Sequence, residues 1–197
     1  MEQFPKEIDL KDGTTMSVSP LSKRDGRALL AFFTALPKHD RIFLEEDVTR
    51  KEVIDRWIRE LDHDKVFTII AEKDSLIHGY ATLHFNSHGW QRHVAEMRCV
   101  ISRKYQHKGL GTALMRELLS FADQKGITKI SAQVMDIQAS AQRALHKLGF
   151  KKAAELKDFA TDIRGKTHNL VVMVNNVPEL WEKMKDLLFY SDVRTMH

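Results

Sequence analysis

The sequence is poor in cysteine and has no long run of apolar residues. Its one cysteine, Cys99, excludes an internal disulfide and a cysteine-rich zinc site. No stretch reaches the ~18 to 20 apolar residues that a membrane-spanning helix needs, and Met1–Pro5 lacks the basic-then-apolar pattern of a secretory signal. We therefore expect a cytoplasmic protein whose folding depends on its hydrophobic core.

The sequence also has only a small excess of charge of one sign. Lys and Arg number 31 against 27 Asp and Glu, the net charge is +4, and no run of five or six basic residues occurs. This weak bias is not a nucleic-acid signature, although it favours an anionic ligand such as a phosphate-bearing cofactor. With 43% hydrophobic and 29% charged residues in 197, the chain fits one globular domain and excludes disorder, collagen and coiled coil.

The first third of the chain has helical periodicity. Leu29, Phe32, Phe33 and Leu36 share one helical face that Pro37 ends. Thr49 and Glu52 have the spacing of a capping box, which predicts the start of a second helix. Its expected inner face comprises Val53, Trp57, Ile58 and Leu61.

The rest of the chain alternates strands and helices. Residues 66–71 and 79–85 predict an antiparallel hairpin, and 93–101 a third strand. Further elements are expected, in order, as a helix from about 110 to 126, a strand at 129–135, a helix ending at 149, strands at 150–159 and 168–174, and a last helix over about 178–190. This order predicts a single α/β domain over 1–197, with a mixed sheet flanked by helices on both faces.

A glycine loop joins the third strand to the next helix. The stretch from Val100 to Thr112 ends in Gly109-Leu110-Gly111-Thr112. Amides at a helix N-terminus have no internal partner and face the positive end of the helix dipole, so such a junction binds anions. The third glycine of the dinucleotide fingerprint and the Gly-Lys-Ser/Thr of a nucleotide-triphosphate loop are both missing.

The pattern Gln106-x-x-Gly109-x-Gly111, followed by Leu148-Gly149-Phe150 at the end of a later helix, resembles the GNAT superfamily of acyl-CoA-dependent N-acetyltransferases. The resemblance is firm over 94–150 and loose over 66–93. More weakly, the Leu10–Gly13 segment and the helix with Phe32 and Phe33 are similar to bacterial protein lysine acetyltransferase domains.

The resemblance implies a GNAT fold and acetyl-CoA as co-substrate. It places the cofactor pyrophosphate on the loop after Gln106, whose amides come from His107, Lys108, Gly109, Leu110, Gly111 and Thr112. It also implies that main-chain groups of Val100 and Ile101 pair with pantetheine like an added strand. The Lys108 side chain either reaches a phosphate or is a solvated loop lysine.

The resemblance also points to Glu96 as the general base that takes the proton of the amine. The alternative is a structural carboxylate paired with Arg98. For the general acid, the superfamily's usual asparagine and tyrosine are replaced by Gln138 and Leu145. Either another group protonates the thiolate or it leaves unassisted; Tyr105 is a possible substitute, although a packing role suits it better.

Other reactive side chains fit ordinary roles. Cys99 is interpreted as a small buried residue rather than an acyl carrier, because no activating base is adjacent. His84, His88 and His93 lack the spacing of a known chelate, so no metal is expected. Trp90 is interpreted as a loop anchor, with shaping of the acceptor mouth as the alternative.

The predicted function is acetyl transfer from acetyl-CoA to a primary amine, by direct attack in a ternary complex. A protein lysine or N-terminal amine is the favoured acceptor. The alternatives are a small amine, such as a polyamine, an amino acid or an aminoglycoside, and a non-catalytic acyl-CoA-binding regulatory module. No nucleic acid or membrane partner is expected, and the sequence does not indicate an oligomeric state.

Overall fold

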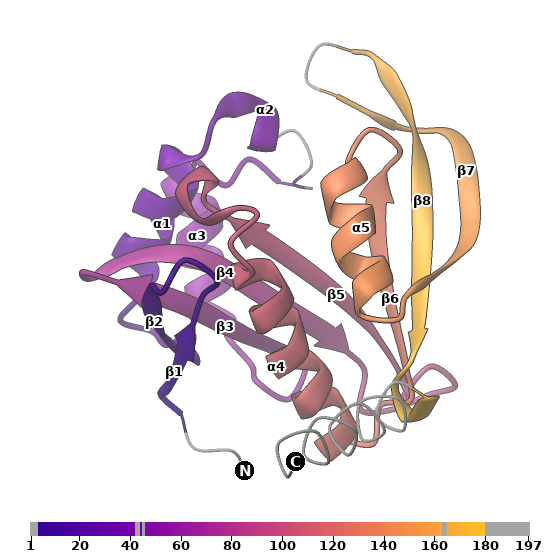
Figure 1. Cartoon of the computed structure of the whole chain (residues 1–197), viewed down its shortest axis with the longest axis horizontal. Helices are drawn as coiled ribbons and strands as arrows, with labels where there is room; N and C mark the ends of the chain where they lie inside the picture. Colours follow the sequence, from indigo (N-terminus) through magenta and orange to yellow (C-terminus); the bar gives the residue numbers. More distant parts are fainter. Residues whose placement is uncertain (1–3, 42–43, 45, 163–164, 180–197) are drawn as a thin grey trace, which may run out of the picture.

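The computed structural model describes residues 4–41, 44, 46–162 and 165–179, and these form one eight-stranded sheet in the order β1-β2-β3-β4-β5-β6-β8-β7 (Figure 1). The strands are β1 Lys6–Asp9, β2 Thr15–Pro20, β3 Val66–Lys73, β4 Leu76–Phe85, β5 Val94–Ile101, β6 Lys129–Met135, β7 Lys151–Thr161 and β8 Thr167–Asn176. The pairing of β5 with β6 is parallel and the other pairings are antiparallel.

Helices cover both faces of the sheet, as the sequence predicts. They are α1 Gly26–Ala35, α2 Lys38–Arg41, α3 Lys51–Arg59, α4 Leu110–Gln124 and α5 Ala139–Lys147. In Figure 1, α4 and α5 lie in front of the sheet, while α1 and α3 lie behind it. The alternation of strand side chains divides the core accordingly: Ile69 and Ala71 join the cluster under α4, and Ile70 joins the cluster with α1.

The two middle strands, β5 and β6, pair only at one end. The register joins 94–96 to 129–131, and beyond these three pairs the strands diverge (Figure 1). Within the described residues, the carboxyl half of β5 therefore has a strand partner only on the β4 side. Its other edge carries main-chain donors and acceptors that are available to a ligand.

Gly79 in β4 allows α4 to lie close to the sheet. A Cβ atom at this position would lie 2.7 Å from Leu114 Cδ1 and 3.2 Å from Ile101 Cδ1, so a larger residue would push the helix away. The close approach lets α4 pack directly against β4 and β5, and the glycine loop precedes this helix.

Some expectations about local structure fail. The Thr49–Glu52 capping box is wrong: α3 begins at Lys51 without a side-chain cap, and the Thr49 hydroxyl donates to Asp47 Oδ1 (2.6 Å). The N-cap position is taken by Arg50, one residue after Thr49, and the threonine hydroxyl bonds locally within the preceding turn instead of capping the helix. On α3 the fully buried side chain is Ile54, which the expected inner face omitted.

Two strands are additional to the expected ones, and one expected helix is not described. The strands β1 and β2 are short and form a hairpin against β3. The helix expected over about 178–190 lies outside the described residues from Leu180 onward. In the part of the chain that the structure describes, none of the helices has the length and hydropathy of a membrane span.

Candidate active site

The glycine loop forms the N-terminus of α4. Gly109 is the N-cap residue with φ +96°, a left-handed conformation that favours glycine, and its carbonyl accepts from the Ala113 amide (2.9 Å). The amides of Leu110, Gly111 and Thr112 belong to the first turn of α4, where an amide has no carbonyl partner within the helix. The loop thus presents several amides at the positive end of a 15-residue helix, which suits a phosphate.

Contacts from both sides hold the loop in place. The Lys11 amide donates to the Lys108 carbonyl (3.1 Å), and the Lys108 ammonium bonds Asp12 (2.9 Å) and lies 5.1 Å from the Tyr105 ring centroid. The hydrogen bond from Lys108 is the main cause that lowers the pKa of Asp12 to about 2. In this structure Lys108 therefore ties the loop to the turn between β1 and β2.

The main chain of β5 points alternately toward β4 and toward the side where β6 diverges. The Ser102 amide donates to the His78 carbonyl (2.9 Å), and the register continues through Tyr80 opposite Val100. Even-numbered residues of β5 thus bond β4, while Cys99 and Ile101 direct their main-chain groups to the unpaired edge. The expectation for Val100 is corrected accordingly: its main chain belongs to the β4 ladder.

On this edge, Ile101 already has one partner. The Gln106 side-chain amide donates to the Ile101 carbonyl (3.1 Å). The motif glutamine therefore joins the loop to the end of β5. The alternation also places the main-chain groups of Cys99 on this unpaired edge, which the sequence alone did not indicate.

A cavity of about 720 Å³ lies on the sheet face covered by α1 and α3. Its walls come from β3, β4 and β5 on one side and from β6, β7 and β8 on the other. The cavity therefore lies where β5 and β6 diverge. The residues that line it include Phe33, Trp57, Leu61, Thr68, Tyr80, Thr82, His84 and Arg98 on one side and Gln133, Met135, Gln138, Ala160, Thr161 and Leu170 on the other.

The cavity wall on β3 and β4 contains a buried hydroxyl network. Thr68 and Thr82 are buried and their hydroxyls lie 3.0 Å apart, in the same cavity wall as Tyr80. Burial raises the pKa of Tyr80 above its ordinary value. The Trp57 ring stacks on Tyr80, with centroids 6.2 Å apart. Nothing in the spacing of these residues along the sequence identified this group, because its members come from β3, β4 and α3.

Glu96 lies on β5 on the cavity side of the sheet, opposite His84 on β4 and Ser131 on β6. Its Oε1 accepts a hydrogen bond from Arg98 Nε (3.0 Å), so the paired arrangement expected as the alternative role is present. His84 and Arg98 line the cavity while Glu96 does not, so Arg98 lies in contact with both the carboxylate and this space. The role of Arg98 at the cavity is a feature that sequence reasoning missed.

Of the residues considered for acid or covalent roles, Leu145 and Tyr105 are buried and Cys99 is partly buried. Leu145 and Tyr105 are both buried in the core cluster under α4, and Tyr105 contacts the His78 ring at 4.6 Å between centroids. Burial raises the pKa of the Cys99 thiol to about 12, which leaves little thiolate at neutral pH. Gln138 lines the cavity, and its side-chain carbonyl accepts from the Met135 amide (2.8 Å).

The histidines considered as metal ligands do not converge. His84 lines the cavity, whereas His88 is exposed and bonds Ser87. Over residues 4–41, 44, 46–162 and 165–179, no three His, Cys, Asp or Glu side chains gather as a metal site would require. Trp90 is 83% exposed and therefore anchors nothing within the described chain.

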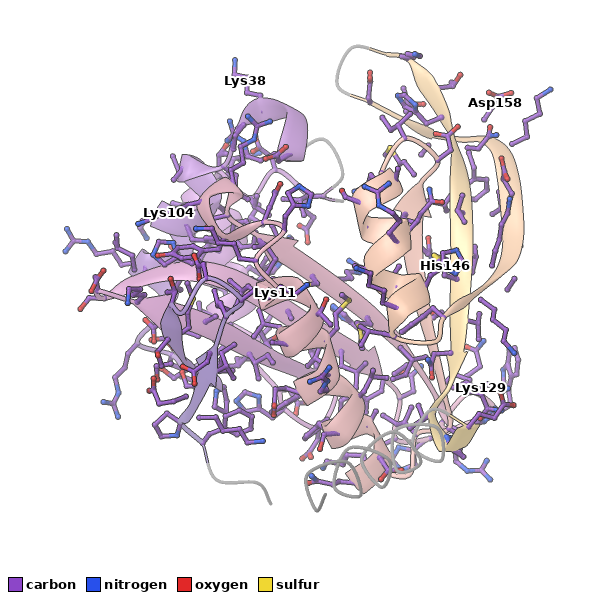
Figure 2. All side chains as sticks on the ribbon, viewed as in Figure 1. Lys11, Lys38, Lys104, Lys129, His146 and Asp158 are labelled. Carbon is purple, nitrogen blue, oxygen red and sulfur yellow. The ribbon has the colours of Figure 1, made fainter. Side chains whose placement is uncertain are left out.

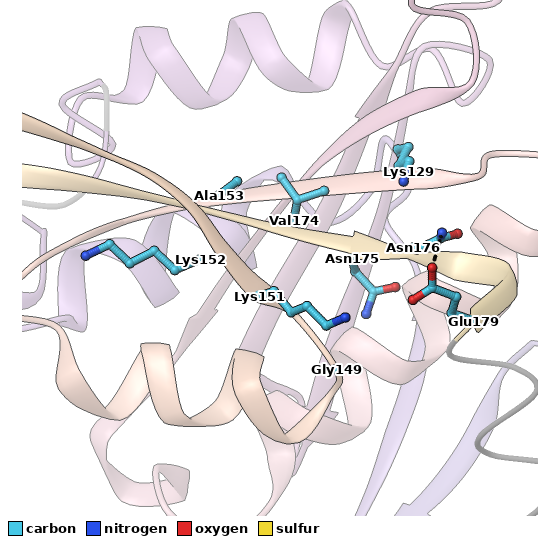
Figure 3. Close-up of a pocket in the computed structure, with 9 residues that line it drawn as sticks. All are labelled: Lys129, Gly149, Lys151, Lys152, Ala153, Val174, Asn175, Asn176 and Glu179. Carbon is cyan, nitrogen blue, oxygen red and sulfur yellow. Dashed lines mark hydrogen bonds between the residues drawn. The ribbon is translucent and has the colours of Figure 1, made fainter.

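A second, smaller cavity of about 250 Å³ lies at the opposite end of β6 and β8 (Figure 3). Lys129, Lys151 and Asn175 line it, and the Asn175 amide donates to the Leu148 carbonyl (2.8 Å). None of the glycine-loop residues lines this cavity. It also shares no lining residue with the larger cavity, so it is separate from the space beside Arg98.

The comparisons identify the family. The model of the acetyltransferase (GNAT) family matches residues 30–150, and the chain therefore belongs to this family. No curated protein matches the sequence. The family's enzymes transfer acetyl groups from acetyl-CoA, and this chain is a GNAT-family N-acetyltransferase.

Solved structures share the fold at low sequence identity. The ribosomal-protein-S5-alanine acetyltransferase from Vibrio fischeri has a TM-score of 0.74 and 14% identity, covering 87% of this chain and 96% of that one. The GNAT domain of PAT from S. lividans has a TM-score of 0.73 and 15% identity, with the same coverage of 87% and 96%. The yncA protein from Salmonella typhimurium, solved with acetyl-CoA, has a TM-score of 0.69 and 19% identity, covering 83% and 95%.

Proposed function

We propose that this enzyme acetylates a primary amine by direct attack on acetyl-CoA within a ternary complex. The observation that carries the proposal is the divergence of β5 from β6, which brings three features together. An unpaired main-chain edge, an amide-rich helix N-terminus and a cavity of about 720 Å³ all meet at the carboxyl half of β5. An acyl donor and an acceptor entering from opposite faces of the sheet would meet there.

The residues present fit acetyl-CoA. The loop amides from His107 to Thr112 would hold the pyrophosphate, and Gly109 and Gly111 leave space for it because they have no side chain. The main-chain groups of Cys99 and Ile101 would pair with pantetheine as an added strand. When bound, the cofactor supplies the acetyl thioester.

Glu96 is proposed as the general base. An ammonium acceptor must lose a proton before its nitrogen can attack, and a carboxylate is suited to take it. Glu96 lies at the last paired position of β5, where the strands begin to diverge, and Arg98 holds one of its oxygens. The geometry fits a carboxylate that acts directly or through a water at the edge of the cavity.

The favoured acceptor is a protein lysine or an N-terminal amine. The name of one structural neighbour, a ribosomal-protein-S5-alanine acetyltransferase, gives a protein amine as that enzyme's acceptor. A small amine is the second candidate, because a cavity of about 720 Å³ is large enough to enclose one and another neighbour is named for phosphinothricin.

An amine panel tests the proposal. Wild-type enzyme is incubated with acetyl-CoA and, separately, a lysine peptide, a peptide with a free N-terminus, spermidine and kanamycin, and free thiol is monitored. We expect turnover with at least one peptide amine. Turnover with spermidine or kanamycin alone would favour a small-molecule enzyme, and tight acetyl-CoA binding without any turnover would favour a regulatory acyl-CoA-binding module.

A further inference from the structure

His168 is buried between two carboxylates that belong to different elements. It is 5% exposed, which is unusual for a histidine on a strand whose partner β7 is exposed along nearly its whole length. Its Nε2 lies 3.2 Å from Asp162 Oδ2, and its Nδ1 lies 3.8 Å from Asp136 Oδ1. Asp162 belongs to the β7–β8 hairpin, and Asp136 to the loop after β6.

The end of the hairpin projects past the strand that supports it. The pairing of β8 with β6 ends at Leu170 opposite Met135. In Figure 1 the hairpin extends beyond α5 and beyond the end of β6. Two contacts link this part to the loop after β6: the Asp136 amide donates to the Asn169 carbonyl (3.0 Å), and the His168 ring meets Asp136.

The elements joined by His168 supply the far wall of the acceptor cavity. Ala160, which is paired in register with His168, lines the cavity together with Thr161 and Leu170. Met135 and Gln138, on either side of Asp136, also line it. A displacement of the hairpin relative to the loop would therefore change the width of the cavity while leaving the cofactor loop on α4 unaltered.

We propose that His168 is a positioning residue that fixes the acceptor-side wall, by tying the β7–β8 hairpin to the loop after β6. The inference rests on the proposed function, because it takes the cavity of about 720 Å³ as the acceptor site. The hydrogen bond from Nε2 to Asp162 holds the ring within the hairpin, and the Nδ1 contact with Asp136 crosses to the loop after β6, so one buried imidazole links the two segments. His168 itself does not line the cavity and acts through the residues that do.

The test separates acceptor binding from cofactor binding. With the best amine of the panel, His168→Ala should raise the acceptor KM by about 5- to 20-fold, the range expected when a charge-assisted hydrogen bond is lost. The kcat should stay within about threefold and the Kd for acetyl-CoA should not change, because the chemistry and the loop are untouched. His168→Asn, which retains an amide nitrogen near the Nδ1 position that faces Asp136, should recover part of the lost affinity. The control is His146→Ala, an exposed residue on α5.

A second variant covers the case in which His168→Ala does not fold. Asp136→Asn alters a half-exposed partner and keeps its size, and it should raise the acceptor KM about two- to fivefold. An unchanged acceptor KM in the folded variants, or parallel losses in kcat and acetyl-CoA affinity, would overturn the proposal.

Failure of the proposed function would show differently, as a wild-type enzyme without turnover on any amine. Hydrogen exchange would then still test whether His168 holds the β7–β8 hairpin to the loop after β6. Faster exchange of amides in 158–161 and 167–170 in His168→Ala supports the tie, and unchanged exchange refutes it.

Discussion

The two halves of the sheet are built differently. Strands β3 and β4 in the first half are buried almost throughout, with helices packed on both faces. In the second half, β7 is exposed along nearly its whole length, and α5 covers one face (Figure 2). The first half therefore carries the glycine loop proposed to bind the cofactor, whereas the second carries a cavity wall held by a few polar contacts.

The junction between the halves is small, and the groups proposed for chemistry and for acceptor selectivity lie on opposite sides of it. Only three residue pairs join β5 to β6. Groups that must keep their geometry, such as the loop amides and Glu96, lie on the first half, which has the larger buried core. The residues that we propose to position the acceptor lie on the second half, where exposed strands can vary without disturbing the core.

The largest expected effect concerns Glu96 at the junction. Glu96→Gln should lower kcat by ~10² to 10⁴, because the variant cannot accept the amine proton, while the acetyl-CoA affinity stays nearly the same. Steady-state kinetics and calorimetric titration measure the two quantities. Glu155→Gln, on the exposed β7, is the matched control. A fully active Glu96→Gln would show that another group or a water chain takes the proton.

The next largest effect concerns the glycine loop, which lies on the first half of the sheet. Gly109→Asp puts a carboxylate and a strained backbone where the phosphates are proposed to bind, since the φ of +96° favours glycine. At 100 times the Kd, acetyl-CoA should stabilise the wild type by ~2.7 kcal/mol, and the variant should lose this gain. Thermal melts with and without acetyl-CoA measure it. Gly89→Asp, also at positive φ but in a distant loop, should keep the ligand-induced shift; a shift that persists in Gly109→Asp would refute the assignment.

The pH profile tests whether an acid at the junction limits the rate. The kcat/KM should rise by up to about tenfold per pH unit as the amine acceptor loses its proton, and then reach a plateau. Burial raises the pKa of Tyr80, so this phenol stays protonated through the range in which a tyrosine ordinarily loses its proton and should not cause a decline. Rates between pH 6 and 10 provide the check. A descending limb below pH 10 would reveal an acid that the present assignment lacks.

A smaller effect concerns α5 on the second half. Leu145 is 4% exposed within the core, so Leu145→Tyr should overpack it and cost about 1 to 3 kcal/mol of unfolding free energy. The added hydroxyl should not act as a general acid unless the core rearranges. Denaturant melts and the pH profile test both points. Faster turnover with a new alkaline decline would show that the tyrosine reaches the reacting atoms.

The smallest effect is expected at Cys99, on the unpaired edge of β5. Cys99→Ala should keep kcat within about twofold, because acetyl transfer does not pass through the thiol, and should cost on the order of 1 kcal/mol of stability through a small cavity. Because burial raises the pKa of Cys99 to about 12, nearly all of the thiol is protonated at pH 8. Folded enzyme should therefore resist iodoacetamide at pH 8. A trapped acetyl-thioester on Cys99 would indicate a double-displacement route instead.

The sequence by itself determined the features that depend on local pattern. The strands 66–73, 76–85, 94–101 and 129–135 were predicted nearly to their ends, because side-chain alternation and flanking turns are local signals. Gly109 and Gly111 at the start of α4 were likewise readable, since a strand entering a helix through glycine is a property of a few consecutive residues.

Only the tertiary structure decided which groups meet. The Thr68–Thr82 hydroxyl pair and the contact of His168 with Asp136 each join separate elements, and the place of Arg98 in the cavity wall depends on which strand face is covered. The main-chain direction at Val100 likewise follows from its register with Tyr80, which a sequence pattern does not fix. Spacing along the chain specifies periodicity, whereas register and burial specify contact, because packing brings together residues whose separation in sequence carries no signal.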